Sequence, residues 1–415
     1  MRIPDSFLQR TFMRSLNNTK SSLAEIQYQL TTMKQVNKPS DNPLSNSRIM
    51  RLHNHLEKIN TFKTNINYGK SMIDSSILSL GSMQEAMDSV KLELTKLNSA
   101  VVGGDYTTFA DSIDGSLDLI LDLANSEFNG QYNFGGAQNG EKPFYYDEAN
   151  NRVVTQRYIG GDKEVRISET IKQKFNVAGR EIFQSVLAQK GNLDSNLDIG
   201  VAQDTSSKVY DADGNEYTLD MRYTKTDDNE YQLTYDVIDS DNNSVQTKTI
   251  TEIKFDSITG KFSSIGENTF GEIKIDVPGN KIDFVIDVSK LKVLDSPKKL
   301  NETLNQKSNI FNTLISIRDG LRRGEKPTAE QVEMVDKFNS HLLNNMSKAG
   351  SISNKLTATE SVINNRELEV TELLSFEQDV DVARATIELQ TKQYMLDLTY
   401  KISSMILPRS LLDYL

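Results

Sequence analysis

The chain has 415 residues, of which 37% are hydrophobic and 7% aromatic, and it carries a formal charge of −11 at pH 7. This length accommodates two or three domains, while the acidic balance argues against nucleic-acid binding, which depends on clustered Lys and Arg. Cysteine is absent, which excludes disulfides, thiolate metal sites and a cysteine nucleophile, and no run of about 20 apolar residues is present to span a membrane.

The first helix is predicted over residues 6–36, where apolar residues return at steps of seven. Arg10 and Arg14 interrupt this stretch, so we expect no cleavable secretory signal. The helix is expected to end near Val36, because residues 37–43 contain two prolines and several turn formers. The main apolar column of this helix consists of Leu16, Leu23 and Leu30.

The second predicted helix carries the strongest periodic pattern in the chain. Pro43 suits its first turn, with Asp41 or Asn42 as the cap. Gly103-Gly104-Asp105 should end it, and a third helix is expected to run back over residues 109–128. Eight consecutive apolar residues at steps of seven indicate one long buried stripe; they are Leu52, Ile59, Ile66, Ile73, Leu80, Met87, Leu94 and Val101.

From Tyr145 to about Val288 apolar and polar residues alternate between turn signals, which predicts β-strands. Residues 256–260 should form the turn of a hairpin, because they contain Asp, Ser and Gly between two alternating segments. Helix is expected to return near Pro297 and to continue to Leu321.

The last segment, Thr328 to Leu415, has few helix breakers and predicts one long amphipathic helix of roughly 100 Å. A stripe of that length needs a partner of similar length, which the N-terminal helices supply. The predicted fold class is therefore α+β: a long antiparallel helical bundle or coiled coil formed by both chain ends, with an inserted β-rich domain in the middle. The apolar columns of this segment are Leu373, Val380, Ile387 and Tyr394, with Leu356, Ile363 and Val370 beside them.

Three domains are predicted from these patterns. Residues 1–37 with 378–415 form terminal helical segments, residues 38–159 with 297–377 form a helical bundle, and residues 160–296 form the inserted β domain.

No pattern of residues predicts catalysis, a cofactor or a metal site. His53 and His55 are two positions apart and do not share a helix face, so they make a poor metal pair. The segment Gly135–Lys142 fails the phosphate-loop pattern because no Ser or Thr follows the Lys. Asp211–Glu216 resembles the start of a calcium loop, but Arg222 stands where the twelfth-position Glu belongs, so a β-turn explains it better and calcium binding stays open.

The terminal columns predict an assembly interface, because their stripes lack an obvious cover within one chain. The predicted interface residues are Leu16, Leu23, Leu30, Val380, Ile387, Tyr394, Leu398 and Met405.

Several short motifs at the two ends resemble a known family. They are Met1-Arg2-Ile3, the linker Asn37-Lys38-Pro39-Ser40-Asp41-Asn42-Pro43, Tyr132-Asn133-Phe134-Gly135-Gly136 followed by Pro143-Phe144, and the ending Ser410-Leu411-Leu412-Asp413-Tyr414-Leu415. In this order they resemble the bacterial flagellar axial proteins of the flagellin superfamily, and among these the hook–filament junction family. Asn42 stands where many members carry a second Asp, and Pro4 also departs from the family's opening.

The resemblance implies a non-catalytic building block of the extracellular flagellum that is exported by the type III route without a cleavable signal. Its implied partners are the first hook-associated protein on the hook side, flagellin on the filament side, copies of itself, and a flagellar export chaperone. It implies no cofactor, no nucleic acid and no membrane insertion, and terminal helices that become ordered on assembly.

Two alternatives remain open from the sequence. A filament flagellin would have the same class of fold at another position in the flagellum. A secreted coiled-coil adhesin or effector would use the β domain to bind a ligand.

Overall fold

The computed structural model describes residues 5–99, 106–155, 158–295, 300–305 and 309–406. The chain divides into two compact parts, Met1–Asn65 with Ala358–Leu415, and Ile66–Thr357. The two longest helices contribute residues to both parts.

Helices form both ends of the described chain and strands form its middle. The helices are α1 (Asp5–Thr32), α2 (Pro43–Ser99), α3 (Thr107–Ala124), α4 (Gly179–Phe183), η1 (a 3-10 turn, Pro278–Asn280), α5 (Ile310–Arg322), α6 (Ala329–Gln378) and α7 (Val382–Ile406). The strands are β1 (Glu127–Phe128), β2 (Gln131–Tyr132), β3 (Phe144–Asp147), β4 (Arg152–Thr155), β5 (Glu164–Arg166), β6 (Lys172–Lys174), β7 (Val186–Asp194), β8 (Ala202–Tyr210), β9 (Glu216–Asp227), β10 (Glu230–Ile238), β11 (Ser244–Phe255), β12 (Phe262–Ile265), β13 (Glu272–Val277), β14 (Ile282–Leu294) and β15 (Asn301–Asn305).

The helices α2 and α6 pair along their lengths in opposite directions. Most of the predicted α2 column is buried, from Ile59 to Leu94, and Leu356, Ile363 and Val370 of α6 are buried as well. The low hydrophobic fraction of the chain is sufficient for these long helices, because each helix buries only one narrow face. Polar contacts join Lys63 to Glu367 (2.5 Å) and Arg48 to Glu377 (2.8 Å) in the first part, and Asp74 to Ser353 (2.7 Å) and Gln84 to Asn339 (2.6 Å) in the second.

The predicted single C-terminal helix is wrong, because the structure breaks it between Gln378 and Val382 into α6 and α7. The carboxylate of Asp381 accepts a hydrogen bond from the backbone N–H of Arg384 (3.0 Å), so it caps a new helix. The N-terminal helix α1 also ends earlier than predicted, at Thr32, which is four residues before Val36. The next residue, Met33, has a φ of 57°.

A cluster of aromatic rings packs around α4 in the second part. Phe183 of α4 lies 4.9–6.1 Å from the ring centroids of four other phenylalanines, which come from a loop, β3, α5 and α6. Such pairs add to the burial of their surface. The helices α3 and α5 pack together beside this cluster, where the guanidinium of Arg318 contacts the carboxylate of Asp114 (2.7 Å). Thr328 caps α6 as predicted, since its hydroxyl oxygen accepts from the N–H of Gln331 (3.2 Å).

The β-rich middle contains two sheets that enclose one core. One has the order β12-β11-β10-β9-β8 and is antiparallel throughout, and the other has the order β13-β14-β7-β15, with β14 and β7 parallel. Alternate residues of β10 are buried, as the two-residue period requires. Tyr223, Tyr231 and Tyr235 of the first sheet and Phe284 and Ile286 of the second lie in the shared core. The predicted turn at 256–260 joins β11 to β12.

Two boundaries of the predicted β block are wrong. Strands begin at Glu127, so Phe128 lies in β1 and the third helix ends at Ala124. Residues 301–305 form β15 instead of helix, because β7 needs a partner along its free edge and β15 supplies it in antiparallel register.

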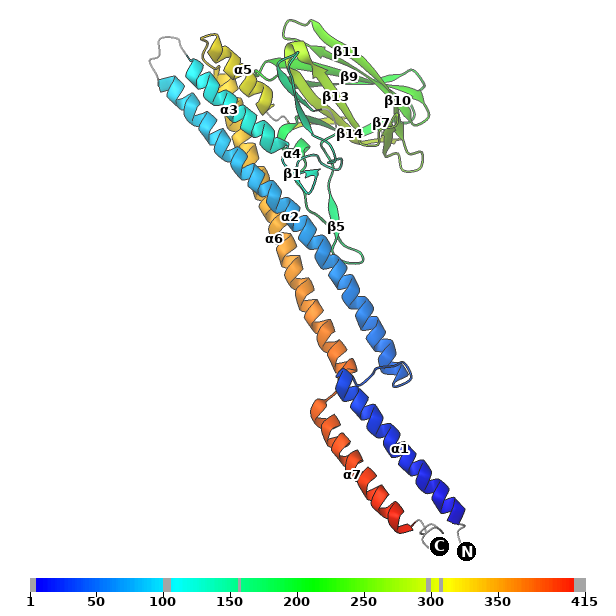
Figure 1. The fold of residues 1–415 in the computed structure, drawn as a ribbon. Helices are drawn as coiled ribbons and strands as arrows, with labels where there is room; N and C mark the ends of the chain where they lie inside the picture. Colours follow the sequence, from blue (N-terminus) through cyan, green and yellow to red (C-terminus); the bar gives the residue numbers. More distant parts are fainter. Residues whose placement is uncertain (1–4, 100–105, 156–157, 296–299, 306–308, 407–415) are drawn as a thin grey trace. The chain divides into compact units, whose positions relative to one another are not determined.

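Several predicted features lie outside the described residues. These are Met1–Ile3, Val101, the break at Gly103–Asp105, the helix start near Pro297 and the ending Ser410–Leu415. Over the rest of the chain, the predicted α+β class is confirmed, with helices of both chain ends paired and a β-rich segment between them (Figure 1).

Candidate assembly interface

The helices α1 and α7 form a terminal pair. It is separated from the long helices by two breaks, one between α1 and α2 and one between α6 and α7. The backbone N–H of Gln35 donates to the carbonyl oxygen of Gln378 (2.7 Å), and the N–H of Val380 donates to the carbonyl oxygen of Met33 (3.1 Å). A β-bridge joins Lys34 to Asp379 at the same place. The two breaks therefore satisfy each other's backbone groups and form one joint.

The linker after α1 is held by its own carboxamide and carboxylate groups. Asp41 Oδ2 accepts from the N–H groups of Asn37 (3.1 Å) and Lys38 (2.8 Å), and Asn42 Oδ1 accepts from the N–H of Ser45 (3.1 Å) to cap α2. This confirms the predicted cap. The turn-forming residues of the linker 37–43 thus fix the backbone conformation that leads into α2.

The helices α1 and α7 lie side by side and run in opposite directions (Figure 1). Leu16 and Ile26 of α1 are buried, Leu23 and Leu30 are half-buried, and the ammonium of Lys20 lies 5.6 Å from the ring centroid of Tyr400. The predicted α1 column therefore packs against α7 of the same chain.

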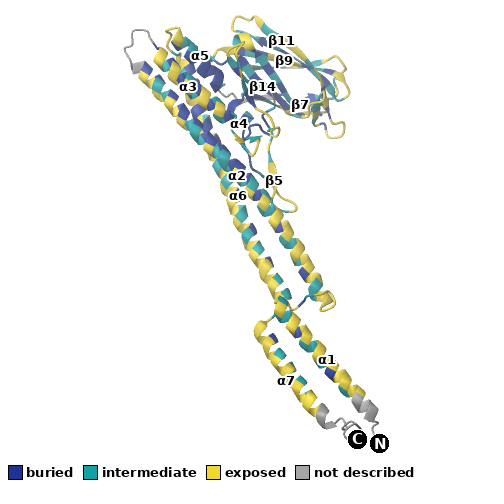
Figure 2. Cartoon of the chain, viewed as in Figure 1, coloured by how far each residue is buried: buried dark blue, intermediate teal, exposed yellow. Residues whose placement is uncertain are grey.

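Helix α7 carries two apolar stripes. Ala385 is buried, and Leu389 and Leu396, on the same helix face, are half-buried. The larger side chains Ile387 and Tyr394 are each 65% exposed. At about 100° per residue, Ile387, Tyr394 and Leu398 of this second stripe stand on the face opposite Ala385, and Ile402 lies toward the side of it. Figure 2 shows that most of α7 is exposed.

The structure separates the predicted interface residues into two groups. Leu16, Leu23 and Leu30 face a partner within the chain, whereas Ile387, Tyr394 and Leu398 do not. Val380 is half-buried in the joint before α7 begins, and the side chain of Met405 lies outside the described part.

The smaller stripe of α7 was missed by the sequence reasoning. Its members stand at steps of four and seven, which is an equally valid helical signal. The smaller stripe consists of Ala385, Leu389 and Leu396. It is less obvious in the sequence because the other column has larger side chains.

The polar candidates have structural partners instead. Asp211 Oδ1 accepts from the N–H groups of Asp213 and Asn215 (2.9 Å each), and Asp213 contacts the ammonium of Lys281 (2.7 Å). The imidazole of His341, the third histidine of the chain beside His53 and His55, contacts the carbonyl oxygen of Glu181 (2.5 Å). Within the described ranges no group of three acidic or His side chains could hold a metal ion, and no helix has the length and apolar character of a membrane span.

Comparison with known proteins gives two family matches and several relatives. Residues 5–139 match the bacterial flagellin N-terminal helical region, and residues 186–365 match the flagellar basal body protein FlaE D2 domain. The flagellar hook-associated protein 3 of Salmonella typhimurium is 26% identical over 221 residues, covering 50% of this chain and 65% of that protein. This alignment thus spans just under two thirds of the Salmonella protein. The protein of the same name from Escherichia coli is 25% identical over 253 residues, covering 54% of this chain and 73% of that protein.

A solved structure of the flagellar junction protein FlgL from Legionella pneumophila aligns with 80% of this chain and all of its own length, at 14% identity and a TM-score of 0.43. The flagellin helical region, the flagellar domain and the two relatives of one name agree, and the chain is similar to flagellar hook-associated protein 3.

Proposed function

We propose that the protein is a structural, non-catalytic subunit of the bacterial flagellum that joins the hook to the filament. Its subunits follow one another around the flagellar axis, with the first hook-associated protein below them and flagellin above. It reaches this place through the flagellar type III export channel, without a cleavable signal and with the help of an export chaperone. Relatives named hook-associated protein 3 support this assignment.

The second apolar stripe of α7 is the observation that carries the proposal. A helix pair that buries one narrow stripe on each helix is marginal in water. Burying a large apolar side chain that is otherwise exposed contributes roughly 1.5–3 kcal/mol. Four such side chains on α7 therefore supply a large driving force for contact with neighbouring subunits, which offsets the entropy of ordering the chain ends; they are Ile387, Tyr394, Leu398 and Ile402.

The shape of the helix pair also suits a tube. One stripe of α7 is occupied by α1 of its own subunit, so the other points to a different surface on a neighbour. Contacts between two different surfaces repeat from subunit to subunit and generate rings or helical arrays. On this proposal, Leu16, Leu23 and Leu30 hold the pair together. The contact between subunits is formed by Ile387, Tyr394, Leu398, Ile402 and Met405.

The first experiment deletes the gene in its host. We expect hooks without filaments and unassembled flagellin in the medium, because flagellin would lack its attachment layer. If the chain is a flagellin instead, the deletion should remove the major filament protein itself. The cells would then carry bare hooks, and the medium would contain no additional flagellin.

The second experiment complements the deletion with variants of α7. Ile387→Asp should give export of the protein but shed filaments and no swimming, because a charge on the second stripe cannot be buried without cost. Gln390→Asp is the matched control, since it places the same charge on an exposed polar position of the same helix. Normal swimming with intact filaments in Ile387→Asp would contradict the proposed contact.

A further inference from the structure

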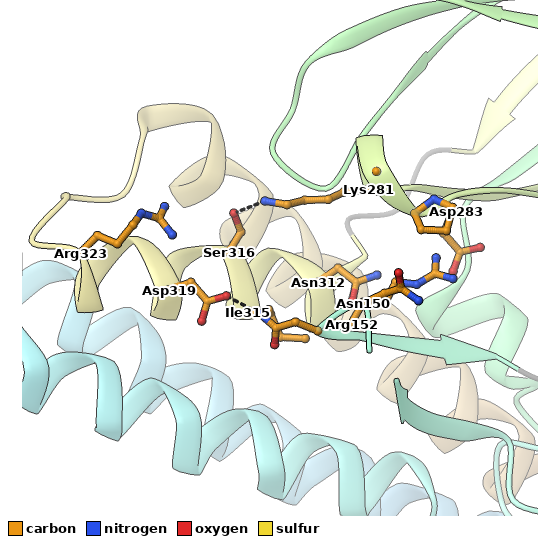
Figure 3. A pocket seen from close by; sticks show the side chains of 12 residues that line it. Asn150, Arg152, Lys281, Asp283, Asn312, Ile315, Ser316, Asp319 and Arg323 are labelled. Atoms are coloured by element: carbon orange, nitrogen blue, oxygen red, sulfur yellow. Dashed lines mark hydrogen bonds between the residues drawn. The ribbon is translucent and has the colours of Figure 1, made fainter. Parts of the chain in front are cut away.

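Many charged side chains of the second compact part are paired with one another. Examples surround a cavity of about 240 Å³, where the β3–β4 turn, the η1 turn and α5 converge (Figure 3). The guanidinium of Arg152 forms a fork with the carboxylate of Asp276, and the ammonium of Lys281 contacts Asp213 (2.7 Å). Lys163, which stands just before β5, differs from these groups. Within the described part of the chain, no carboxylate forms an ion pair with its ammonium.

The strand pattern explains why Lys163 has no acidic partner. Its neighbours in sequence, Asp162 and Glu164, instead contact ammonium groups of the β5–β6 hairpin. These contacts join Asp162 to Lys174 (2.5 Å) and Glu164 to Lys172 (3.5 Å). Because successive side chains of an extended segment point to opposite sides, Lys163 points the other way, toward α2.

The ammonium of Lys163 shares one acceptor with two other donors. The side-chain carbonyl oxygen of Gln131 accepts from the hydroxyl of Tyr68 (2.7 Å) and from the carboxamide of Asn139 (2.8 Å). Lys163 approaches the same oxygen at 3.4 Å, and its other neighbour is the sulfur of Met72 at 4.0 Å. A carbonyl oxygen has two lone pairs and a thioether is a weak acceptor, so the three N–H donors of the ammonium are poorly satisfied.

The backbone holds this ammonium in place. The N–H of Lys163 donates to Oδ1 of Asn176 (2.8 Å), and its carbonyl oxygen accepts from the N–H of Phe175 (3.0 Å). The side chain is half-buried, and burial lowers the pKa of Lys163 to about 8. The amine is therefore about half neutral at pH 8, whereas a lysine of ordinary pKa, near 10.4, is less than about 1% neutral. A desolvated lysine of this kind is an activated nucleophile.

We propose that Lys163 is an acylation site that reacts with small acyl phosphates. Its neutral amine attacks the carbonyl carbon of the acyl phosphate, so that a C–N bond forms and the C–O bond to the phosphate breaks. The departing phosphate takes the electron pair of that bond and the proton that the amine loses. The product is a neutral amide with one N–H donor, and its carbonyl oxygen adds a new acceptor.

The product suits the cluster around Gln131 better than other modified lysines do. Methylation keeps the positive charge and adds no acceptor. An acyl group removes the half-buried charge and supplies a second oxygen for the donors that now share the Gln131 carbonyl, which are Tyr68, Asn139 and Lys163.

The test treats the purified full chain with acetyl phosphate between pH 7 and 9. Peptide mass spectrometry then gives the initial acetylation rate of each lysine, with Lys290, an exposed lysine of β14, as the internal comparator. We expect Lys163 to react about tenfold faster than Lys290 at pH 8, because a larger neutral fraction outweighs a lower basicity. The rate at Lys163 should level off above about pH 8, where the amine is largely neutral.

Two variants with the same change of charge test the cluster. Gln131→Glu places a carboxylate of the same shape beside the ammonium, and a nearby opposite charge favours the charged amine. Acetylation of Lys163 at pH 8 should therefore fall about tenfold, while that of Lys290 stays the same. Gln138→Glu is the matched control, since it adds the same charge at an exposed position of the same segment, and it should keep the wild-type rate at Lys163.

Either of two results would overturn the proposal. One is an initial rate at Lys163 no higher than that at Lys290 in the wild-type chain. The other is a Gln131→Glu variant that melts at the wild-type temperature and is still acetylated at Lys163 at the wild-type rate, because the cluster would then not control the amine.

Discussion

The backbone N–H of Val380 donates a hydrogen bond to the carbonyl oxygen of Met33 (3.1 Å), which links the two breaks that separate α1 and α7 from the long helices. Met33 adopts a positive φ of 57°, a conformation that a non-glycine residue holds only when its surroundings support it. The joint therefore depends on both chain ends, although 347 positions separate the two residues (380 − 33).

Removing that donor should loosen the joint. In Val380→Pro the ring eliminates the N–H and with it one hydrogen bond of about 1 kcal/mol. The fraction of molecules in which the joint is open should therefore rise about fivefold. The rate of proteolysis between residues 378 and 382 should rise by the same factor. Val382→Pro is the matched control, because the first helical position tolerates proline, and it should be cut at the wild-type rate. Equal rates for both variants would show that the joint does not restrain this segment.

The aromatic cluster around Phe183 should dominate the stability of the second part. Phe183→Ala leaves a cavity among four rings and should lower the free energy of unfolding by about 3–5 kcal/mol in urea titrations. Phe376→Ala removes the same group from a side chain that is 85% exposed and should change stability by less than about 0.5 kcal/mol. A small effect of Phe183→Ala would mean that the cluster contributes little to the stability of this part.

The turn at Gly136 should tolerate no side chain. Its φ is +63°, and a Cβ atom would lie 2.1 Å from the carbonyl oxygen of Gly160. Gly136→Ala should therefore lower the melting temperature and cost about 2 kcal/mol or more. Gly140→Ala, where an added Cβ meets nothing within 4 Å, should stay close to the wild type. A wild-type melting temperature for Gly136→Ala would contradict this account of the turn.

The carboxyl of Glu272 should make stability depend on pH. Burial raises its pKa to about 7 from an ordinary 4.5, although the neighbouring Arg180 opposes this shift. The folded chain thus binds this proton more tightly than the unfolded chain. Its contribution to stability is therefore fully present below about pH 4.5 and is lost as the pH rises to about 7.

Glu272→Gln removes this titration. We expect the free energy of unfolding of the wild type to fall relative to that of Glu272→Gln between pH 4.5 and 7, and the difference to stay constant above pH 7. Urea titrations at four pH values measure it. Glu267→Gln, at an exposed position of the preceding turn, should follow the wild-type profile. Parallel profiles of wild type and Glu272→Gln would show that the group does not titrate in this range.

The periodic patterns of the sequence were sufficient to determine the helical ends, the β-rich middle and the pairing of the two chain ends. Steps of seven placed the α2 column in the core, and two-residue alternation identified strands such as β10. These signals are local, because the period of the backbone decides which side chains share a face.

Only the tertiary structure decided where the long C-terminal helix breaks and which stripe of α7 meets α1. Residues 379–381 contain no proline or glycine, so the break depends on backbone hydrogen bonds to a distant segment. The strand at 301–305 likewise forms because β7 offers an unpaired edge, which a local apolar spacing cannot reveal. The cavity at Arg152 and Asp283 is assembled from three segments far apart in the chain, and no sequence pattern brings them together.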